Sequence, residues 1–184
     1  LLVVRQLRSV GGPARDMSLF PEPGDWTTQS VGAVDGIRCG IGGWTYAPWR
    51  DNFYPKGLVQ RRELEYASRH LGCIEINGTY YGAQKPATYA KWRNETPEGF
   101  VFSAKAPMRI MQSKALAKTG AQIEDFVGGI SALGDRLGPL LWQFDAGLRL
   151  QRDSFEAFCD LLPRDADSRP LRHVLDVRDA GFID

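Results

Sequence analysis

A chain of 184 residues suits a single domain, or part of a larger one, with a core of ordinary size. Hydrophobic residues make up 43% of it and charged residues 24%, which is typical of a globular protein. The formal net charge of +1 excludes a general electrostatic attraction to nucleic acids or membranes. The apolar runs are shorter than the roughly 20 residues that span a bilayer, so we expect no membrane partner.

The cysteines are three, an odd number without a C-x-x-C pair, at Cys39, Cys73 and Cys159. This pattern argues against a disulfide framework or a zinc knuckle and predicts a protein of the reducing cytoplasm. Two histidines cannot build a histidine-rich metal site. The G-x-G-like run at 40–43 lacks the spacing of a dinucleotide-binding loop. We therefore expect neither a metal nor a cofactor.

Strand-like and helix-like segments alternate along residues 36–184, which we predict to form one domain. Apolar and β-branched runs predict five strands, at 37–43, 73–77, 100–105, 140–144 and 173–178. Amphipathic spacing predicts four helices, at 58–71, 86–95, 123–137 and 153–162. Such alternation predicts an α/β fold with a parallel sheet, either open or curled into part of an eight-stranded barrel.

The two ends of the sequence differ from this pattern. Residues 1–35 are rich in turn-forming residues, and we predict an irregular extension with the natural start at Met17. Residues 1–15 contain arginine and no acid, which also fits an organelle transit peptide. No helix follows the fifth strand, so we expect an incomplete barrel of about five β/α units whose remaining strands are missing from this chain.

Glu75 interrupts the apolar run of the second predicted strand. Burying an unpaired carboxylate is costly, so Glu75 needs a cation or a hydrogen-bond donor nearby. A buried carboxylate of this kind occurs both in functional sites and in structural ion pairs, and the sequence alone does not distinguish these two roles for Glu75. We expect a neighbouring cation to lower the pKa of Glu75 and to keep it ionised at neutral pH.

Polar and aromatic residues recur at or just after the ends of the predicted strands. They are Trp44, Glu75, Asn77, Lys105, Gln143 and Arg178, with Tyr46 and Tyr80 close by in the sequence. In a barrel the carboxyl ends of the strands meet at one mouth, where active sites lie. In an open sheet the same residues would follow one edge instead.

Several separate motifs in a fixed order resemble the YecE-like family, also called domain of unknown function 72. They are Gly40-Ile-Gly-Gly-Trp-Thr-Tyr46, Glu63-Leu-Glu-Tyr-Ala67, Glu75-Ile-Asn-Gly-Thr-Tyr-Tyr81, Phe100-Val-Phe-Ser-Ala-Lys105, Leu137-Gly-Pro-Leu-Leu-Trp-Gln143 and His173-Val-Leu-Asp-Val-Arg178. The resemblance implies a TIM-type (β/α)8 barrel and no established activity. Asp176, Asp179 and Gln112 stand where the family usually has Glu, His and His, which weighs against histidine-dependent chemistry.

Three functional hypotheses follow for the barrel mouth. In the first, an enzyme acts on a small polar or anionic substrate, phosphorylated or sugar-like, with Glu75 as general acid or base. Lys105 and Arg178 then bind anionic groups, while Asn77 and Gln143 contribute polar contacts and Trp44, Tyr46 and Tyr80 a stacking wall. In the second, the same residues bind a ligand without catalysis; a nucleic acid is disfavoured by the small net charge. In the third, the charged residues are a structural ion network.

Overall fold

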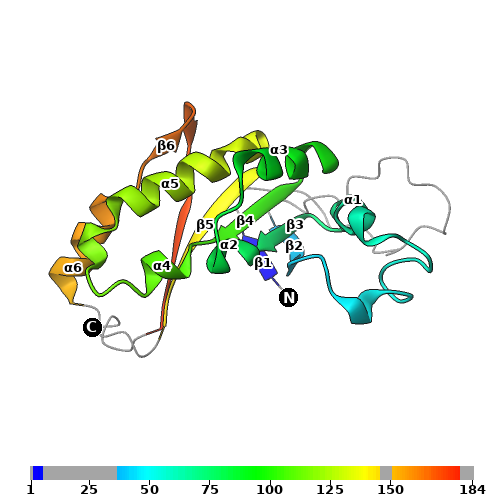
Figure 1. Ribbon diagram of the computed structural model, residues 1–184, viewed down its shortest axis with the longest axis horizontal. Helices are drawn as coiled ribbons and strands as arrows, with labels where there is room; N and C mark the ends of the chain where they lie inside the picture. The colour runs from blue at the N-terminus through cyan, green and yellow to red at the C-terminus, as the bar shows by residue number, and fades with distance from the viewer. Residues whose placement is uncertain (1, 6–36, 146–150, 179–184) are drawn as a thin grey trace, which may run out of the picture.

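The protein is built around a curled, mostly parallel β-sheet (Figure 1). The structure is a computed structural model, and it describes residues 2–5, 37–145 and 151–178. Its strands are arranged in the order β1-β2-β3-β4-β5-β8. The parallel strands are β2 (Ile37–Gly42), β3 (Cys73–Ile76), β4 (Val101–Lys105), β5 (Leu137–Phe144) and β8 (His173–Val177). The predicted parallel sheet, with its strands adjacent in sequence order, is confirmed.

Strand β1 (Leu2–Arg5) was not anticipated, since the whole region 1–35 had been expected to be irregular. It pairs with β2 in antiparallel fashion, with Leu2 opposite Gly40 and Arg5 opposite Ile37. The predicted natural start at Met17 lies outside the described residues, and so does Asp179, which stands where the family usually has His.

Helices connect successive strands in a β/α alternation. The longer ones are α1 (Glu63–His70), α3 (Pro86–Glu95), α5 (Gly120–Ile130) and α6 (Arg152–Asp160). The short ones are α2 (Gly78–Tyr81), α4 (Met108–Met111), η1 (Ala47–Trp49), η2 (Gln60–Arg62), η3 (Leu116–Lys118) and η4 (Ser131–Arg136). A two-stranded hairpin of β6 (Asp165–Ala166) and β7 (Arg169–Pro170) precedes β8.

Three predicted helices have different bounds in the structure, and the one expected at 153–162 is only slightly displaced, to Arg152–Asp160. The helix expected at 58–71 starts only at Glu63, after the η2 turn. The helix expected at 123–137 ends at Ile130 and continues as η4, which is interrupted at Gly134. Gly134 has φ 58°, a left-handed conformation that ends helical geometry and suits glycine. The apolar period continues past this point because Leu133 is still buried, so periodicity alone could not locate the break.

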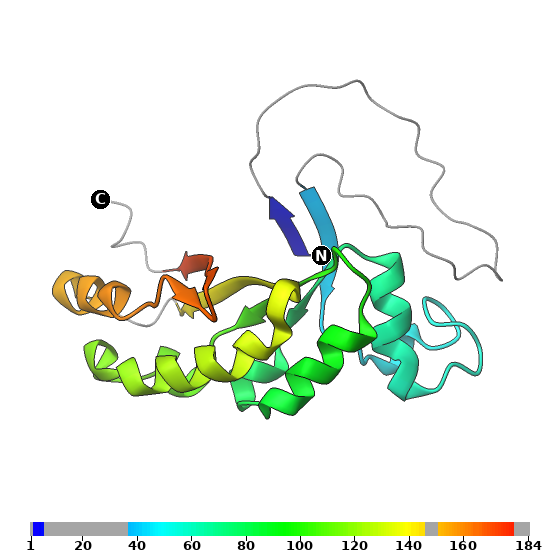
Figure 2. The same ribbon diagram turned by 90° about the horizontal axis from the view of Figure 1, so that it is seen from above.

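The hydrophobic core lies between the convex face of the sheet and the helices. Side chains alternate along a strand, so Ile74 and Ile76 point to one face of β3 and Glu75 to the other. Ile74 and Ile76 are fully buried, as are Trp142 and Phe144 of β5. Figure 2 shows α3 and α5 together on one side of the sheet. From α6, Phe158 packs its ring 5.4 Å from that of Trp142.

The sheet curves enough for its distant strands to influence one another. Asp176 on β8 acts electrostatically on Glu75 on β3, although two strands lie between them. Arg38 on β2 acts in the same way on Arg172, just before β8. The concave face therefore gathers side chains from both ends of a five-stranded arc. The arc is a half-barrel, and the described residues do not form a closed eight-stranded barrel.

Candidate functional site

The candidate site lies on the concave face of the sheet, toward the carboxyl ends of β3, β4 and β8. Glu75 pairs in register with Ser103 on β4, and Gln143 on β5 pairs with Asp176 on β8. Partners in a parallel ladder point to the same face, and Lys105 lies two residues beyond Ser103. The register thus places all five side chains on the face opposite the helices.

Glu75 is half-buried, and burial raises the pKa of its carboxyl group. Lys105 acts to lower this pKa, but the effect of burial is larger, and the negative charge of Asp176 raises the pKa further. The prediction of a lowered pKa is therefore wrong in direction, because desolvation exceeds the stabilisation by one cation. Among the described side chains, none forms a hydrogen bond or an ion pair with Glu75.

Lys105 is held beside an aromatic ring. Its Nζ atom lies 4.5 Å from the centre of the Tyr80 ring, within the range of a cation–π interaction. The hydroxyl of Tyr80 accepts a hydrogen bond of 3.4 Å from Nε2 of Gln112. The Thr79 hydroxyl lies 2.6 Å from the carbonyl oxygen of Lys105 and 2.8 Å from that of Ile76, which ties α2 to the ends of two strands.

Asn77 and Gly42 lie next to Glu75 at the end of β3. A Cβ atom on Gly42 would be 2.8 Å from Nδ2 of Asn77, so the Asn77 amide occupies the space above this glycine. Gly42 is also the register partner of Glu75 on β2. The absence of a side chain at Gly42 therefore leaves room for the Asn77 amide.

Arg178 does not have the expected position beside Glu75. It forms an ion pair with Asp176, at 3.1 Å from Nη2 to Oδ2, and its side chain is 52% exposed. Gln143 donates a weak hydrogen bond of 3.4 Å to Asp145. The charged groups that act on Glu75 are Lys105 and Asp176, whereas Arg178, just beyond β8, pairs with Asp176.

Trp44 and Tyr46 do not join this group. The ring of Trp44 packs 4.9 Å from Trp92 of α3 and 6.2 Å from Phe102, a core residue of β4. Tyr46 is 54% exposed and makes an edge contact with Trp49. Gly43, with φ 74°, directly follows β2, and Trp44 next to it packs against the core instead of facing Glu75.

Ser103 was missed by the sequence analysis. Its hydroxyl is fully buried and has no hydrogen-bond partner among the described residues, although it lies beside Glu75. The sequence did contain a signal for Ser103, because it lies two residues before Lys105 in a predicted strand and residues two apart on a strand share a face. Thr79 gave no such signal, since its contact with Lys105 joins segments far apart in the sequence, and Gln112 stood out only as a position where the family usually has His.

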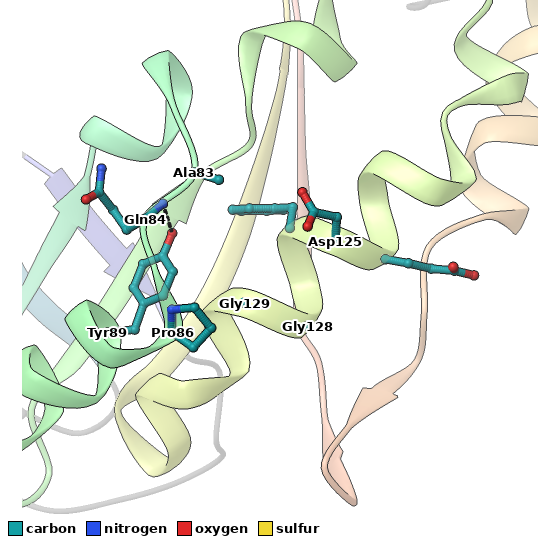
Figure 3. Close-up of a pocket in the computed structure, with 9 residues that line it drawn as sticks. Ala83, Gln84, Pro86, Tyr89, Asp125, Gly128 and Gly129 are labelled. Atoms are coloured by element: carbon teal, nitrogen blue, oxygen red, sulfur yellow. Dashed lines mark hydrogen bonds between the residues drawn. The ribbon is translucent and has the colours of Figure 1, made fainter.

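A separate cavity of about 290 Å³ lies on the helix side of the sheet (Figure 3). It is lined by residues of the loop before α3, of α3 itself and of α5, among them Gln84, Tyr89, Asp125 and Gly129. The Tyr89 hydroxyl accepts a hydrogen bond of 3.5 Å from the backbone N–H of Gln84. This cavity is on the opposite side of the sheet from Glu75 and is not part of the candidate site.

Two further kinds of site are absent from residues 2–5, 37–145 and 151–178. Nowhere in these ranges do three His, Cys, Asp or Glu side chains gather in a way that could hold a metal ion. Every helix in the same ranges is too short or too polar to cross a bilayer.

Solved structures with a similar fold come from two bacteria. A DUF72 family protein from Thermotoga maritima matches with a TM-score of 0.58 and 23% identity, over 74% of this chain and 54% of that one. One from Enterococcus faecalis matches with a TM-score of 0.57 and 20% identity, over 75% of this chain and 50% of that one. These likenesses support the α/β half-barrel.

Sequence relatives agree with this fold. The UPF0759 protein YecE of Escherichia coli is 30% identical over 110 residues, or 60% of this chain and 38% of that protein. The UPF0759 protein YunF of Bacillus subtilis is 33% identical over 70 residues, or 38% of this chain and 24% of that protein. The matched part thus spans well under half of these curated relatives. The model of the family "Protein of unknown function DUF72" matches residues 38–184, and the chain therefore belongs to the DUF72 family.

Proposed function

We propose that the concave face around Glu75 binds a small polar or anionic molecule, phosphorylated or sugar-like, and that Glu75 exchanges a proton with it. The observation that carries this proposal is the state of Glu75. Its carboxyl group is half-buried, has a raised pKa and forms no hydrogen bond or ion pair with a described side chain. A carboxyl group in this condition suits general acid–base catalysis, since its pKa is moved toward the working pH.

Lys105 supplies positive charge for an anionic group. Its ammonium group contacts the face of the Tyr80 ring, and no described carboxylate forms an ion pair with it. A partly desolvated cation of this kind stabilises negative charge on a bound ligand. Arg178 contributes less, because Asp176 already balances its charge. The Tyr80 ring and the Gln112 amide offer a flat surface and a polar contact on the same side.

A purely structural ion network fits these observations less well. Such a network would pair Glu75 directly with a cation, since an unpaired buried charge destabilises a fold. The second candidate is ligand binding without catalysis, and it is favoured by the Lys105–Tyr80 contact, which needs no proton transfer. The two candidates share a ligand class and differ in the role of Glu75.

A ligand and turnover screen of the whole chain tests the proposal. Phosphorylated and sugar-like molecules would be screened by thermal shift, and each ligand found would be assayed for turnover. We expect Glu75→Gln to keep binding but to lower turnover roughly 100- to 10,000-fold. Lys105→Met should lose binding of anionic ligands, whereas the exposed control Glu98→Gln should behave as the unmodified protein. Binding without turnover supports the second candidate, and no binding by any such molecule contradicts both.

A further inference from the structure

Three arginines from separate elements converge at the amino-terminal end of the strands, away from Glu75. Arg93 lies in the last turn of α3, Arg169 in β7, and Arg172 directly before β8. A Cβ atom on Gly134 would be 2.9 Å from Nη1 of Arg93 and 3.3 Å from Nη1 of Arg169. Two guanidinium groups are therefore held against one point of the backbone.

A cavity of about 240 Å³ opens beside these groups. Its lining comes from η4, the start of β5 and the β6–β7 hairpin, and includes Gly134, Arg169 and Arg172. In Figure 1 the segment that follows α5 lies beside α3, which brings Arg93 to the same end of the sheet. Gly134 has φ 58° and carries no side chain, so the Arg93 and Arg169 side chains can approach its backbone closely.

The positive charge of this cavity is not balanced within the described residues. Arg93, Arg169 and Arg172 form no ion pair with any carboxylate in the part of the chain that the structure describes. Asp135 also lines the cavity, but it forms an ion pair with Arg136. Burial and the like charge of Arg38 both lower the pKa of Arg172, which indicates a locally positive environment.

We propose that this arginine-lined cavity binds a phosphate group, either as inorganic phosphate or as part of a phosphate monoester. Guanidinium groups are planar and present parallel N–H donors that match the oxygens of phosphate. Bringing two or three of them together without counter-charge costs free energy, and a bound dianion would remove that repulsion. The site is at the other end of the strands from Glu75 and does not depend on the function proposed there.

Isothermal titration of the whole chain tests this site. Inorganic phosphate and a simple phosphate monoester would be titrated separately, with sodium chloride at the same ionic strength as the reference. The variants are Arg93→Gln and Arg169→Gln. A third variant, Arg169→Lys, keeps the positive charge but removes the parallel N–H donors of the guanidinium group. The matched control is Arg61→Gln, which removes one exposed arginine of η2 far from the cavity in the sequence.

We expect phosphate to bind, and each of the two glutamine variants to weaken binding about tenfold or more, as loss of a charge-assisted hydrogen bond does. Arg169→Lys should fall between the unmodified protein and Arg169→Gln, and Arg61→Gln should bind normally. Tighter binding of the monoester would identify a phosphorylated metabolite as the ligand, and equal binding would identify the free anion. The absence of binding, or equal weakening by Arg61→Gln, would overturn the proposal.

Discussion

The indole Nε1 of Trp142 donates a hydrogen bond of 2.9 Å to Nδ1 of His173, which joins the neighbouring strands β5 and β8. The other ring nitrogen of His173, Nε2, lies 2.8 Å from the carbonyl oxygen of Pro163. Because Nδ1 accepts this hydrogen bond, it carries no hydrogen of its own, so Nε2 carries the ring hydrogen and donates a hydrogen bond to the carbonyl oxygen of Pro163. A neutral imidazole in a single tautomer thus fixes the loop before the β6–β7 hairpin to the core.

Replacing His173 by Phe should lower the free energy of unfolding by about 1–3 kcal/mol. The ring would still fill the space, but the N–H of the fully buried Trp142 would lose its acceptor. Urea denaturation followed by far-UV circular dichroism measures the change.

The double variant of His173→Phe with Trp142→Phe separates this hydrogen bond from packing. If the bond matters, the double variant should lose less free energy of unfolding than the sum of the two single changes. Additive losses would show that the two rings contribute by packing alone.

Glu75→Gln should make the protein relatively more stable as the pH rises. The pKa of Glu75 in the fold is above its ordinary value of 4.5, so the folded protein holds this proton after the unfolded chain has lost it. Its stabilising contribution is complete below pH 4.5 and is lost as the pH rises through the folded pKa. Thermal unfolding at several pH values compares variant and parent. A stability difference that grows toward acid would contradict the raised pKa, and Glu98→Gln serves as the exposed control.

Ser103→Ala should be neutral or slightly stabilising in the absence of ligand. The Ser103 hydroxyl is buried without a described partner, so removing it relieves the cost of an unsatisfied polar group. Thr79→Val is the contrasting variant, since the Thr79 hydroxyl bonds to two carbonyl oxygens. It should lose about 1 kcal/mol or more, as measured by urea denaturation. Equal losses in the two variants would mean that Ser103 has a partner in solution.

Gly40→Ala should destabilise the sheet by roughly 3 kcal/mol or prevent folding. A Cβ atom at this position would lie 2.0 Å from the carbonyl oxygen of Cys73, a backbone atom that cannot move without breaking the ladder. Gly128→Ala on α5 is the matched control, because its Cβ would have no atom within 4 Å. That variant should gain about 0.5–1 kcal/mol from helix propensity. A thermal shift of the same sign in both variants would refute the steric argument.

The strand order and the placement of Glu75 and Lys105 could be predicted from the sequence. Alternating strands and helices leave few arrangements for a parallel sheet, and residues two apart on a strand share a face. These arguments use only local periodicity, and the parallel register then brought Glu75 and Lys105 onto one surface.

Other features depended on geometry that periodicity does not contain. Trp44 packs against Trp92 of α3 and Phe102 of β4, contacts between segments far apart in the sequence. The direction of the Glu75 pKa shift depends on how deeply β3 is covered and on Asp176, which reaches it only through the curvature of the sheet. The arginine cavity joins α3, η4 and β7, whose contacts no local pattern reveals.

The edge of β2 can pair with β1 or with another strand, but not with both at once. The edge of β2 that β1 covers, from Ile37 to Gly40, is an edge to which a further parallel strand could otherwise add. A strand arriving there would have to displace β1 and take over its main-chain hydrogen bonds. Amide hydrogen exchange along β2 would report this competition, because protection at 37–40 would track whichever strand occupies the edge. The N-terminal strand is therefore an internal competitor for assembly on this side of the sheet.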